Sequence, residues 1–235
     1  VGSEMCIRDR RFSKRTDWRD EDFSHSVPYF PLVGLVIGFL LAAVNYSLFY
    51  IETPLFLRVT LLLLAEIIIT GGLMYDGFMD TADGVFSARS RERMLEIMKD
   101  SHVGSNAVLA IIILLLLKIA AYLELSGETL TWVLLTMSVA TRTFMVVFIV
   151  NFPYARKEGI GHMFTKYAKP FYTYIAFAVC AGIIAACGLQ YLAVAGICFT
   201  VTLIIAQYLK TQLGGLTGDT YGCLLYTSPS PRDCS

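Results

Sequence analysis

The sequence predicts an all-α, polytopic integral membrane protein, and three observations support this fold class. The 235 residues are 56% hydrophobic and only 16% charged. The mean hydropathy is +0.61, which departs from soluble domains. The apolar residues are gathered in six long blocks, each able to cross ~30 Å of hydrocarbon as a helix. A helix satisfies its own backbone in lipid, so we expect a bundle of about six spans.

The six predicted spans are separated by connections of very different length. The fifth and sixth are divided only by Leu189 and Gln190, and together they are too long for one span, so a tight hairpin is expected. In order, the blocks are Tyr29–Tyr50, Leu55–Met74, Ala107–Leu125, Leu130–Val150, Phe171–Gly188 and Tyr191–Leu209.

Both ends of the chain resemble translated adaptor sequence. We expect VGSEMCIRDR at residues 1–10 and CLLYTSPSPRDCS at residues 223–235 to be non-native, leaving residues 11–222 as a single membrane-embedded domain. Cys180, Cys187 and Cys198 lie inside apolar blocks without CxxC spacing. The sequence therefore predicts neither a disulfide framework nor a zinc site.

Basic residues alternate between the connecting segments. The segments before the first block, between the second and third, and between the fourth and fifth are rich in Lys and Arg, whereas the other three internal connections hold at most one. Short basic segments stay in the cytoplasm, so the pattern predicts a cytoplasmic N-terminus in a plasma membrane. Residues 75–106, 151–170 and 212–222 would then emerge on one cytoplasmic face, where they can converge on one site.

Three aspartates follow the second block in GGLMYDGFMDTADG, residues 71–84. If the second span continues as a helix through this motif, Asp76, Asp80 and Asp83 stand at i, i+4 and i+7, within an arc of ~60°. Three carboxylates on one stripe repel one another, and a hard cation such as Mg²⁺ takes such oxygen ligands, often together with substrate phosphates. The sequence therefore predicts a magnesium site. The alternative is a merely solvated polar helix end.

Glycine recurs around these aspartates. Gly71, Gly72, Gly77 and Gly84 have no side chain, so a bulky ligand or a neighbouring backbone can approach them closely. The alternative is helix packing in the bilayer, which we expect less for Gly77 and Gly84.

The polar loops add candidate binding residues. SARSRERMLEIMKDSHVG predicts a short helix whose apolar side carries Met94, Leu95, Ile97 and Met98. Its arginines suit phosphate groups and lipid head groups equally well. No GxxxxGK[ST] or GxGxxG motif supports a soluble nucleotide fold. The further candidates are Arg89, Arg93, Lys99, Asp100, Arg156, Glu158, Gly215 and Asp219.

Three ionisable residues fall within the apolar blocks. Such residues are functional candidates by default, since a charge in hydrocarbon is expensive. They are Glu66, Lys118 and Arg142, of which Lys118 can alternatively reach the interface by snorkelling and Arg142 can pair internally.

Four stretches resemble cobalamin synthase, the adenosylcobinamide-GDP ribazoletransferase family. They are FPLVGLVIG at 30–38, GGLMYDGFMDTADGVFSARSRERMLEIMKDSHVG at 71–104, YARKEGIG at 154–161 and LGGLTGDTYG at 213–222. The resemblance implies an Mg²⁺-using integral membrane enzyme, with residues 11–222 as its catalytic domain. It also implies that α-ribazole, or its 5′-phosphate, replaces GMP on adenosylcobinamide-GDP. A homo-oligomer, or association with other cobalamin-assembly enzymes, would fit the same family.

The implied chemistry agrees with the residues present. Phosphoryl transfer needs positioning and charge neutralisation more than covalent help. We expect Asp76, Asp80 and Asp83 to hold Mg²⁺, Asp83 also to accept the hydroxyl proton, and Asp219 to contact metal or ribose. Phosphate contacts are expected from Arg89, Arg93 and Arg156, and further substrate contacts from Gly77, Gly84, Lys99, Asp100, Glu158 and Gly215.

Two departures from the family pattern stand out. Many members have His where this chain has Met74, and the family continues beyond residue 222 through a further span. The alternatives are a CDP-alcohol phosphotransferase, whose DGxxAR pattern and later acidic half are missing, and a secondary transporter using Glu66 and Arg142.

Overall fold

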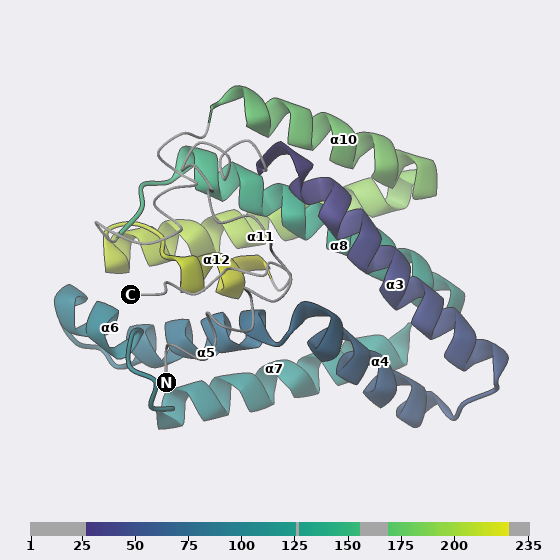
Figure 1. Cartoon of the computed structure of the whole chain (residues 1–235), viewed down its shortest axis with the longest axis horizontal. Coiled ribbons are helices and arrows are strands. Elements are labelled where there is room, and N and C mark those ends of the chain that lie inside the picture. Colours follow the sequence, from purple (N-terminus) through teal and green to yellow (C-terminus); the bar gives the residue numbers. More distant parts are fainter. Residues whose placement is uncertain (1–26, 126, 156–168, 226–235) are drawn as a thin grey trace, which may run out of the picture.

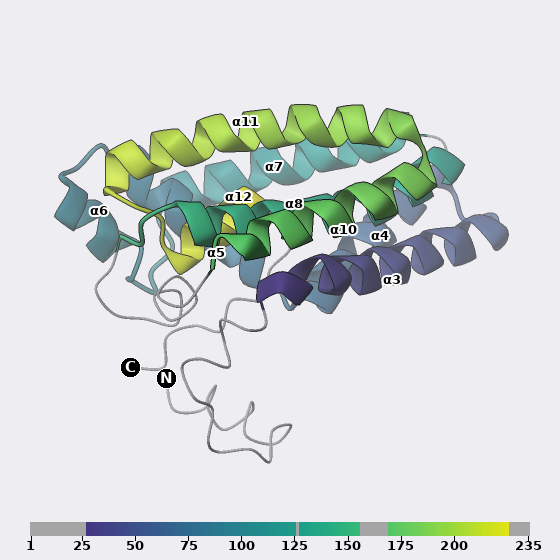
Figure 2. The ribbon, with the colours of Figure 1, turned by 90° about the horizontal axis from the view of Figure 1, so that it is seen from above.

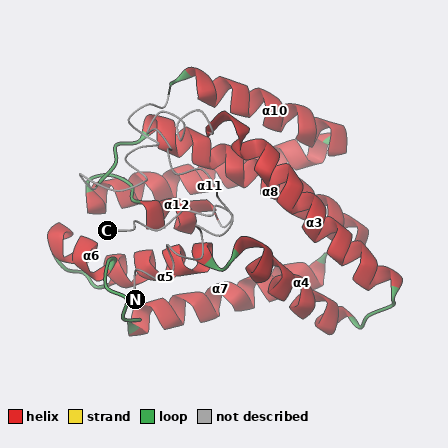
Figure 3. Cartoon of the chain, viewed as in Figure 1, coloured by secondary structure: helices red, strands yellow, loops and turns green. Residues whose placement is uncertain are grey.

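The computed structural model describes residues 27–125, 127–155 and 169–225, and every regular element in these ranges is a helix (Figures 1 and 3). A short 3₁₀ turn, η1 (Val27–Tyr29), leads into the first long helix. The α-helices are α3 (Phe30–Tyr50), α4 (Leu55–Thr70), α5 (Leu73–Phe86), α6 (Arg91–Ile97), α7 (Ser105–Glu124), α8 (Gly127–Asn151), α10 (Phe171–Cys187), α11 (Leu189–Leu213) and α12 (Gly218–Leu225).

The six predicted apolar blocks are helical except for a break at Gly71 and Gly72 in the second, which confirms the all-α membrane fold. Among the described residues, four helices are long and apolar enough to cross a membrane: α3 (with η1), α7, α8 and α11. The bent pair α4–α5 makes a fifth candidate span, and α10 is a shorter apolar helix of 17 residues. The predicted hairpin is confirmed, because α10 ends at Cys187 and α11 begins at Leu189 after Gly188.

Helix α8 is the centre of the bundle, and α3 is packed tightly against it. A Cβ on Gly34 would lie 2.5 Å from the carbonyl oxygen of Ser138, and one on Gly38 would lie 2.9 Å from the Cα of Leu135. The two glycines therefore let the backbones of α3 and α8 touch, as small residues do in membrane helix pairs. The amide of Asn45 joins the same helices by donating to the carbonyl of Gly127, 2.9 Å away.

The outer helices expose apolar side chains. Helix α7 buries only Ala107, and it exposes large apolar residues such as Leu109, Ile113 and Leu117. Helix α11 likewise exposes Ile197 and Ile204. The long helices lie side by side along a common direction, with α6 at one end of the bundle (Figure 2). Apolar surfaces of this extent on membrane-length helices are suited to lipid contact.

The second predicted span does not run on through the aspartate motif, so that expectation is wrong. Helix α4 ends at Thr70, and α5 leaves it at an angle of 90°. Gly71 and Gly72 cause the break, because both adopt the left-handed conformation, with φ of +68° and +71°. Residues with a Cβ avoid this region. The aspartates consequently stand on a separate helix of 14 residues.

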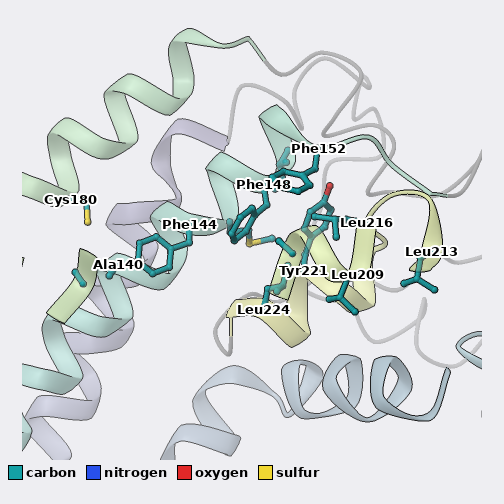
Figure 4. Close-up of a cluster of buried hydrophobic side chains, with 14 of the residues drawn as sticks. Ala140, Phe144, Phe148, Phe152, Cys180, Leu209, Leu213, Leu216, Tyr221 and Leu224 are labelled. Carbon is teal, nitrogen blue, oxygen red and sulfur yellow. The ribbon is translucent and has the colours of Figure 1, made fainter. Parts of the chain in front are cut away.

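The largest buried cluster contains side chains of α5, α6, α8, α10, α11 and α12, and part of it is drawn in Figure 4. Phe148 of α8 and Phe152, just after the end of α8, meet edge to face, with ring centroids 5.4 Å apart. Tyr221 and Leu224 of α12 and Leu213 of α11 pack into the same cluster. The cluster fixes α12, a helix that includes residues up to Leu225, against the centre of the fold.

Candidate active site

Helices α5 and α12 cross with their backbones in contact. A Cβ on Gly77 would lie 2.8 Å from the carbonyl oxygen of Asp219, and one on Gly222 would lie 3.7 Å from the Cα atoms of Gly77 and Met74. Gly77 stands between Asp76 and Asp80 in the sequence. The crossing therefore brings Asp219, from the third polar stretch, to the helix that carries the first two aspartates.

Two threonines fix the first turn of α12. The backbone N–H of Thr217 donates to Oγ1 of Thr220 at 2.7 Å, and the N–H of Thr220 donates to Oγ1 of Thr217 at 3.2 Å. This reciprocal pair satisfies helix-end donors in the manner of a capping box. Both threonines are fully buried, so the turn that holds Asp219 is rigidly placed.

The second and third polar stretches are joined directly. Tyr154 and Leu216 form a parallel β-bridge. The N–H of Ala155 donates to the carbonyl of Leu216 at 2.8 Å, and the N–H of Leu216 donates to the carbonyl of Pro153 at 2.9 Å. A Cβ on Gly215 would lie 2.7 Å from the carbonyl oxygen of Pro153. This junction, together with the crossing of α5 and α12, agrees with the prediction that the polar stretches converge.

Two tyrosine rings pack against each other at this junction. The rings of Tyr154 and Tyr221 stack with centroids 6.5 Å apart. The Tyr221 hydroxyl is buried and has no hydrogen-bond partner among the described residues. Burial raises the pKa of Tyr221 well above its ordinary value. The hydroxyl therefore stays protonated and can donate to a bound oxygen.

Helix α6 also reaches the third stretch, through a residue that was not singled out in the sequence. The guanidinium of Arg91 lies against Gly214, where a Cβ would overlap it. Gly214 ends α11 with φ of +73°. Nothing in the sequence distinguishes Arg91 from Arg89 and Arg93, so only the fold reveals this contact.

Asp83 lies apart from the other two aspartates of its helix. Its carboxylate lies against Gly104, the residue that precedes the first turn of α7, and a Cβ there would overlap it. A negative charge is favoured at a helix N-terminus by ~0.3–1 kcal/mol. Asp83 therefore links the end of α5 to the start of α7.

Of the two uses expected for the predicted glycines, close approach by other parts of the protein is the one that the structure shows. Gly77 and Gly215 accept neighbouring backbone, as described above, and a Cβ on Gly84 would lie 2.5 Å from the Cγ of Met98. The space at all three positions is occupied by the protein itself. Packing thus accounts for Gly77 and Gly84 as well, because α12 and the end of α6 approach α5 closely.

The predicted basic candidates are spread along the surface. Arg89 and Lys99 are exposed, and Nη1 of Arg93 donates to Oε2 of Glu96 at 2.7 Å. Asp100 and His102 form an exposed pair at 2.5 Å, which lowers the pKa of Asp100 and raises that of His102. Arg156 and Glu158 lie outside the described residues.

A buried ion pair stands behind the aspartate helix. Lys118 of α7 donates to Oε1 and Oε2 of Glu66 at 2.5 and 2.6 Å, and it approaches the hydroxyl of Tyr75 at 3.3 Å. Tyr122 donates to the same carboxylate at 3.4 Å. Lys118 therefore does not snorkel: it ties α4, α5 and α7 together beside Asp76.

The donor set at α5 can be compared with what Mg²⁺ requires. Within the described parts of the chain, no three His, Cys, Asp or Glu side chains lie close enough to share one metal ion. Asp76 and Asp80, one turn apart and half-buried, still offer two hard oxygen donors. Mg²⁺ is commonly held by one or two carboxylates together with substrate phosphates and waters. The pair fits this mode, whereas Asp83 is turned aside.

Comparison with known proteins gives a consistent result. The family model described as Cobalamin-5-phosphate synthase matches residues 10–229. The chain is similar to curated proteins named adenosylcobinamide-GDP ribazoletransferase. That of Desulforamulus reducens is 40% identical, over 91% of this chain and 85% of the relative. That of Clostridium novyi is 38% identical, over 88% and 83%, and that of Escherichia coli is 37% identical, over 92% and 88%. No solved structure matches the chain.

Proposed function

Because the chain belongs to the Cobalamin-5-phosphate synthase family, we propose that it is an adenosylcobinamide-GDP ribazoletransferase. In this reaction α-ribazole, or its 5′-phosphate, replaces GMP on adenosylcobinamide-GDP. The product is adenosylcobalamin or its 5′-phosphate. The observation that carries the proposal is the crossing of α5 and α12, which puts Asp219 beside the segment that holds Asp76 and Asp80.

The proposed step forms one phosphorus–oxygen bond and breaks another. A ribose hydroxyl of α-ribazole attacks the phosphorus that bears cobinamide. The bond from that phosphorus to the GMP oxygen breaks, and GMP leaves with the bonding electrons. Asp83, the aspartate that lies apart from the other two, accepts the hydroxyl proton. Such a step gains most from positioned charges around the phosphorus.

Residues of α5 and of the neighbouring segments would bind the metal ion, the phosphates and the ribose. Asp76 and Asp80 would hold Mg²⁺, which supplies positive charge to the diphosphate oxygens when bound. The hydroxyl of Tyr221 can donate a hydrogen bond to a substrate oxygen, since burial keeps it protonated. Arg156 and Arg89 are the proposed phosphate contacts from the polar loops, and Asp219 is a proposed ribose or metal contact.

The location of the site follows from the arrangement of the loops. Of the polar stretches that meet at α5 and α12, residues 75–106 and 151–170 are basic connections, and residues 212–222 follow Lys210. We therefore propose that the site faces the cytoplasm from a plasma membrane. Self-association, or association with other cobalamin-assembly enzymes, remains part of the proposal.

The test is product formation by membranes that carry a full-length version of the protein. The membranes receive adenosylcobinamide-GDP with α-ribazole or its 5′-phosphate, and cobalamin product and GMP are measured with Mg²⁺ and after its removal by a chelator. We expect equal amounts of both products and their loss with the chelator. Absence of product in membranes that contain folded protein would contradict the function.

A further inference from the structure

Arg142 is a charged residue buried in the middle of the fold. It belongs to α8, the central helix, and is only 1% exposed. Its side chain lies along α3, where a Cβ on Gly34 would be 2.9 Å from Cγ of Arg142. None of its three guanidinium nitrogens has a hydrogen-bond partner among the described residues. The expectation that Arg142 pairs internally is therefore not met within that part of the chain.

Other buried polar groups in the fold have more hydrogen-bond or ion-pair partners than Arg142 has. Lys118, a cation inside α7 whose side chain is 16% exposed, has Glu66 as its counter-charge at 2.5 Å. Arg58, buried in α4, has only one buried nitrogen, Nε, without a partner among the described residues. Asn45, on the same α3–α8 interface, donates to Gly127 and to Oγ1 of Thr131. A charge without a partner is strongly destabilising in such a setting. Arg142 is thus better explained by a ligand than by a contribution to folding.

The position of Arg142 along α8 can be compared with those of the neighbouring helices. Ile69, in the last turn of α4, packs on a cluster that includes Leu134 of α8 and Ile37 of α3. Arg142 stands eight residues further along α8, or roughly 12 Å. Arg142 is nine residues before Asn151, the last residue of α8, beyond which Tyr154 joins Leu216. Arg142 therefore lies in the half of α8 that leads to the junction of the polar stretches.

The chemistry of the side chain indicates the ligand class. A guanidinium presents a planar fork of N–H donors that matches two oxygens of a phosphate, and it stays charged when buried. We propose that Arg142 is a binding residue for a phosphate oxyanion, supplied by the diphosphate of the substrate. The assignment to the substrate, rather than to a lipid phosphate, rests on the proposed function.

Binding can be measured without turnover, on the purified full-length protein in detergent with Mg²⁺ present. Inorganic pyrophosphate and GDP serve as probes, and the thermal unfolding temperature is the readout. A ligand at 100 times its dissociation constant should raise this temperature of the wild-type protein by several degrees. The variants are R142M, which removes the charge at similar volume, and R142K, which keeps the charge but loses the fork. The control is R58M, which alters a buried arginine at the other end of the bundle.

We expect R142M without ligand to unfold at the same or a higher temperature than the wild type, because it removes an unpaired buried charge. It should lose the shift caused by pyrophosphate and GDP, R142K should show a reduced shift, and R58M should keep the full shift. A merely structural arginine would instead lower the unfolding temperature and leave the shift intact. That result, or no shift in the wild type, overturns the proposal.

Lipid is the other source of phosphate. The unfolding temperature is therefore also measured in nanodiscs of phosphatidylcholine, with and without phosphatidylglycerol. The change caused by phosphatidylglycerol should be the same for R142M as for the wild type. A lipid response that depends on Arg142, with an unchanged pyrophosphate shift, would overturn the substrate assignment.

The proposed role of Arg142 and the proposed function can also be contradicted independently of each other. Turnover unaffected by R142M removes this inference alone, whereas an Arg142-dependent pyrophosphate shift without cobalamin formation removes the proposed function alone.

Discussion

At the scale of single residues, Gly77 is a position in the candidate site where an added side chain would meet backbone. An added Cβ would lie 2.8 Å from the carbonyl oxygen and 3.2 Å from the Cα of Asp219, both of which are backbone. Gly77→Ala must therefore push α12 away from α5. We expect a loss of ~1–3 kcal/mol in the free energy of unfolding, as for overpacked cores, and at least a tenfold loss of activity.

Gly182 provides the matched control for this prediction. It lies on α10, and no atom comes within 4 Å of an added Cβ. Gly182→Ala should be neutral or should stabilise the helix by up to ~1 kcal/mol. Denaturant unfolding of both variants, with cobalamin formation measured in parallel, distinguishes them. Equal stability of the two variants would show that α5 and α12 do not cross as described.

The sequence indicated the importance of the glycines in the aspartate motif but not what each contacts. A glycine allows close approach by a ligand or by backbone, and the pattern alone cannot separate the two. Gly77 faces α12, which lies more than 130 residues later in the chain. The same limit explains why Arg91 was missed: its partner, Gly214, is brought near only by the fold.

At the scale of helices, the break between α4 and α5 depends on backbone conformation. Nothing lies within 4 Å of a Cβ added to Gly71, but its φ of +68° and the +71° of Gly72 are unfavourable for other residues. Replacing both by Ala should cost ~1–2 kcal/mol at each position. The alternative is a straightened helix that carries Asp76 away from α12, so activity should fall in either case.

Measurement of unfolding and activity for the double variant checks this prediction. A variant that keeps wild-type stability and turnover would show that the bend is not required. The helical spacing of the aspartates was predictable from the sequence, since it persists on α5. The bend was not, because a Gly-Gly pair is compatible both with helix packing and with a break.

The ion pair of Glu66 and Lys118 is a second structural feature at the scale of helices, because it holds α4, α5 and α7 together. Glu66→Gln leaves the Lys118 charge buried without a counter-charge. We expect a loss of ~3–5 kcal/mol, typical of a broken buried pair. The exchanged pair E66K/K118E restores opposite charges and should recover part of that loss.

Comparison of E66Q and of the exchanged pair with the wild type by thermal unfolding shows how much of the loss the restored opposite charges recover. If E66Q unfolds like the wild type, the pair does not stabilise the helices. Recovery of activity in the exchanged variant would further indicate that the pair acts by positioning Tyr75 and the adjoining Asp76.

At the scale of the whole molecule, the sequence predicted the fold class because hydropathy and length are local properties. It also predicted that the polar stretches share one end of the bundle, since alternating spans return the chain to the same side. The junction of Tyr154 with Leu216 agrees with this topology. The arrangement of carboxylates was beyond the sequence, because the start of α7 draws Asp83 aside.

The sidedness can be tested by labelling single cysteines in a cysteine-free version of the protein. Ser90, near the aspartate helix, and Glu52, at the opposite end, are both exposed. We expect an impermeant maleimide to label Ser90→Cys in inverted membrane vesicles and Glu52→Cys in intact cells. Labelling of both positions from the same side would contradict the topology.

The central claim is that the aspartates of α5 serve phosphoryl transfer. The most direct measurement is GMP release from adenosylcobinamide-GDP, in the presence of α-ribazole, by full-length Asp80→Asn. Glu124→Gln is the control, because this carboxylate is exposed at the far end of α7. We predict at least a hundredfold loss for D80N and unchanged release for E124Q, with both proteins folded. Full GMP release and cobalamin formation by D80N would contradict the claim.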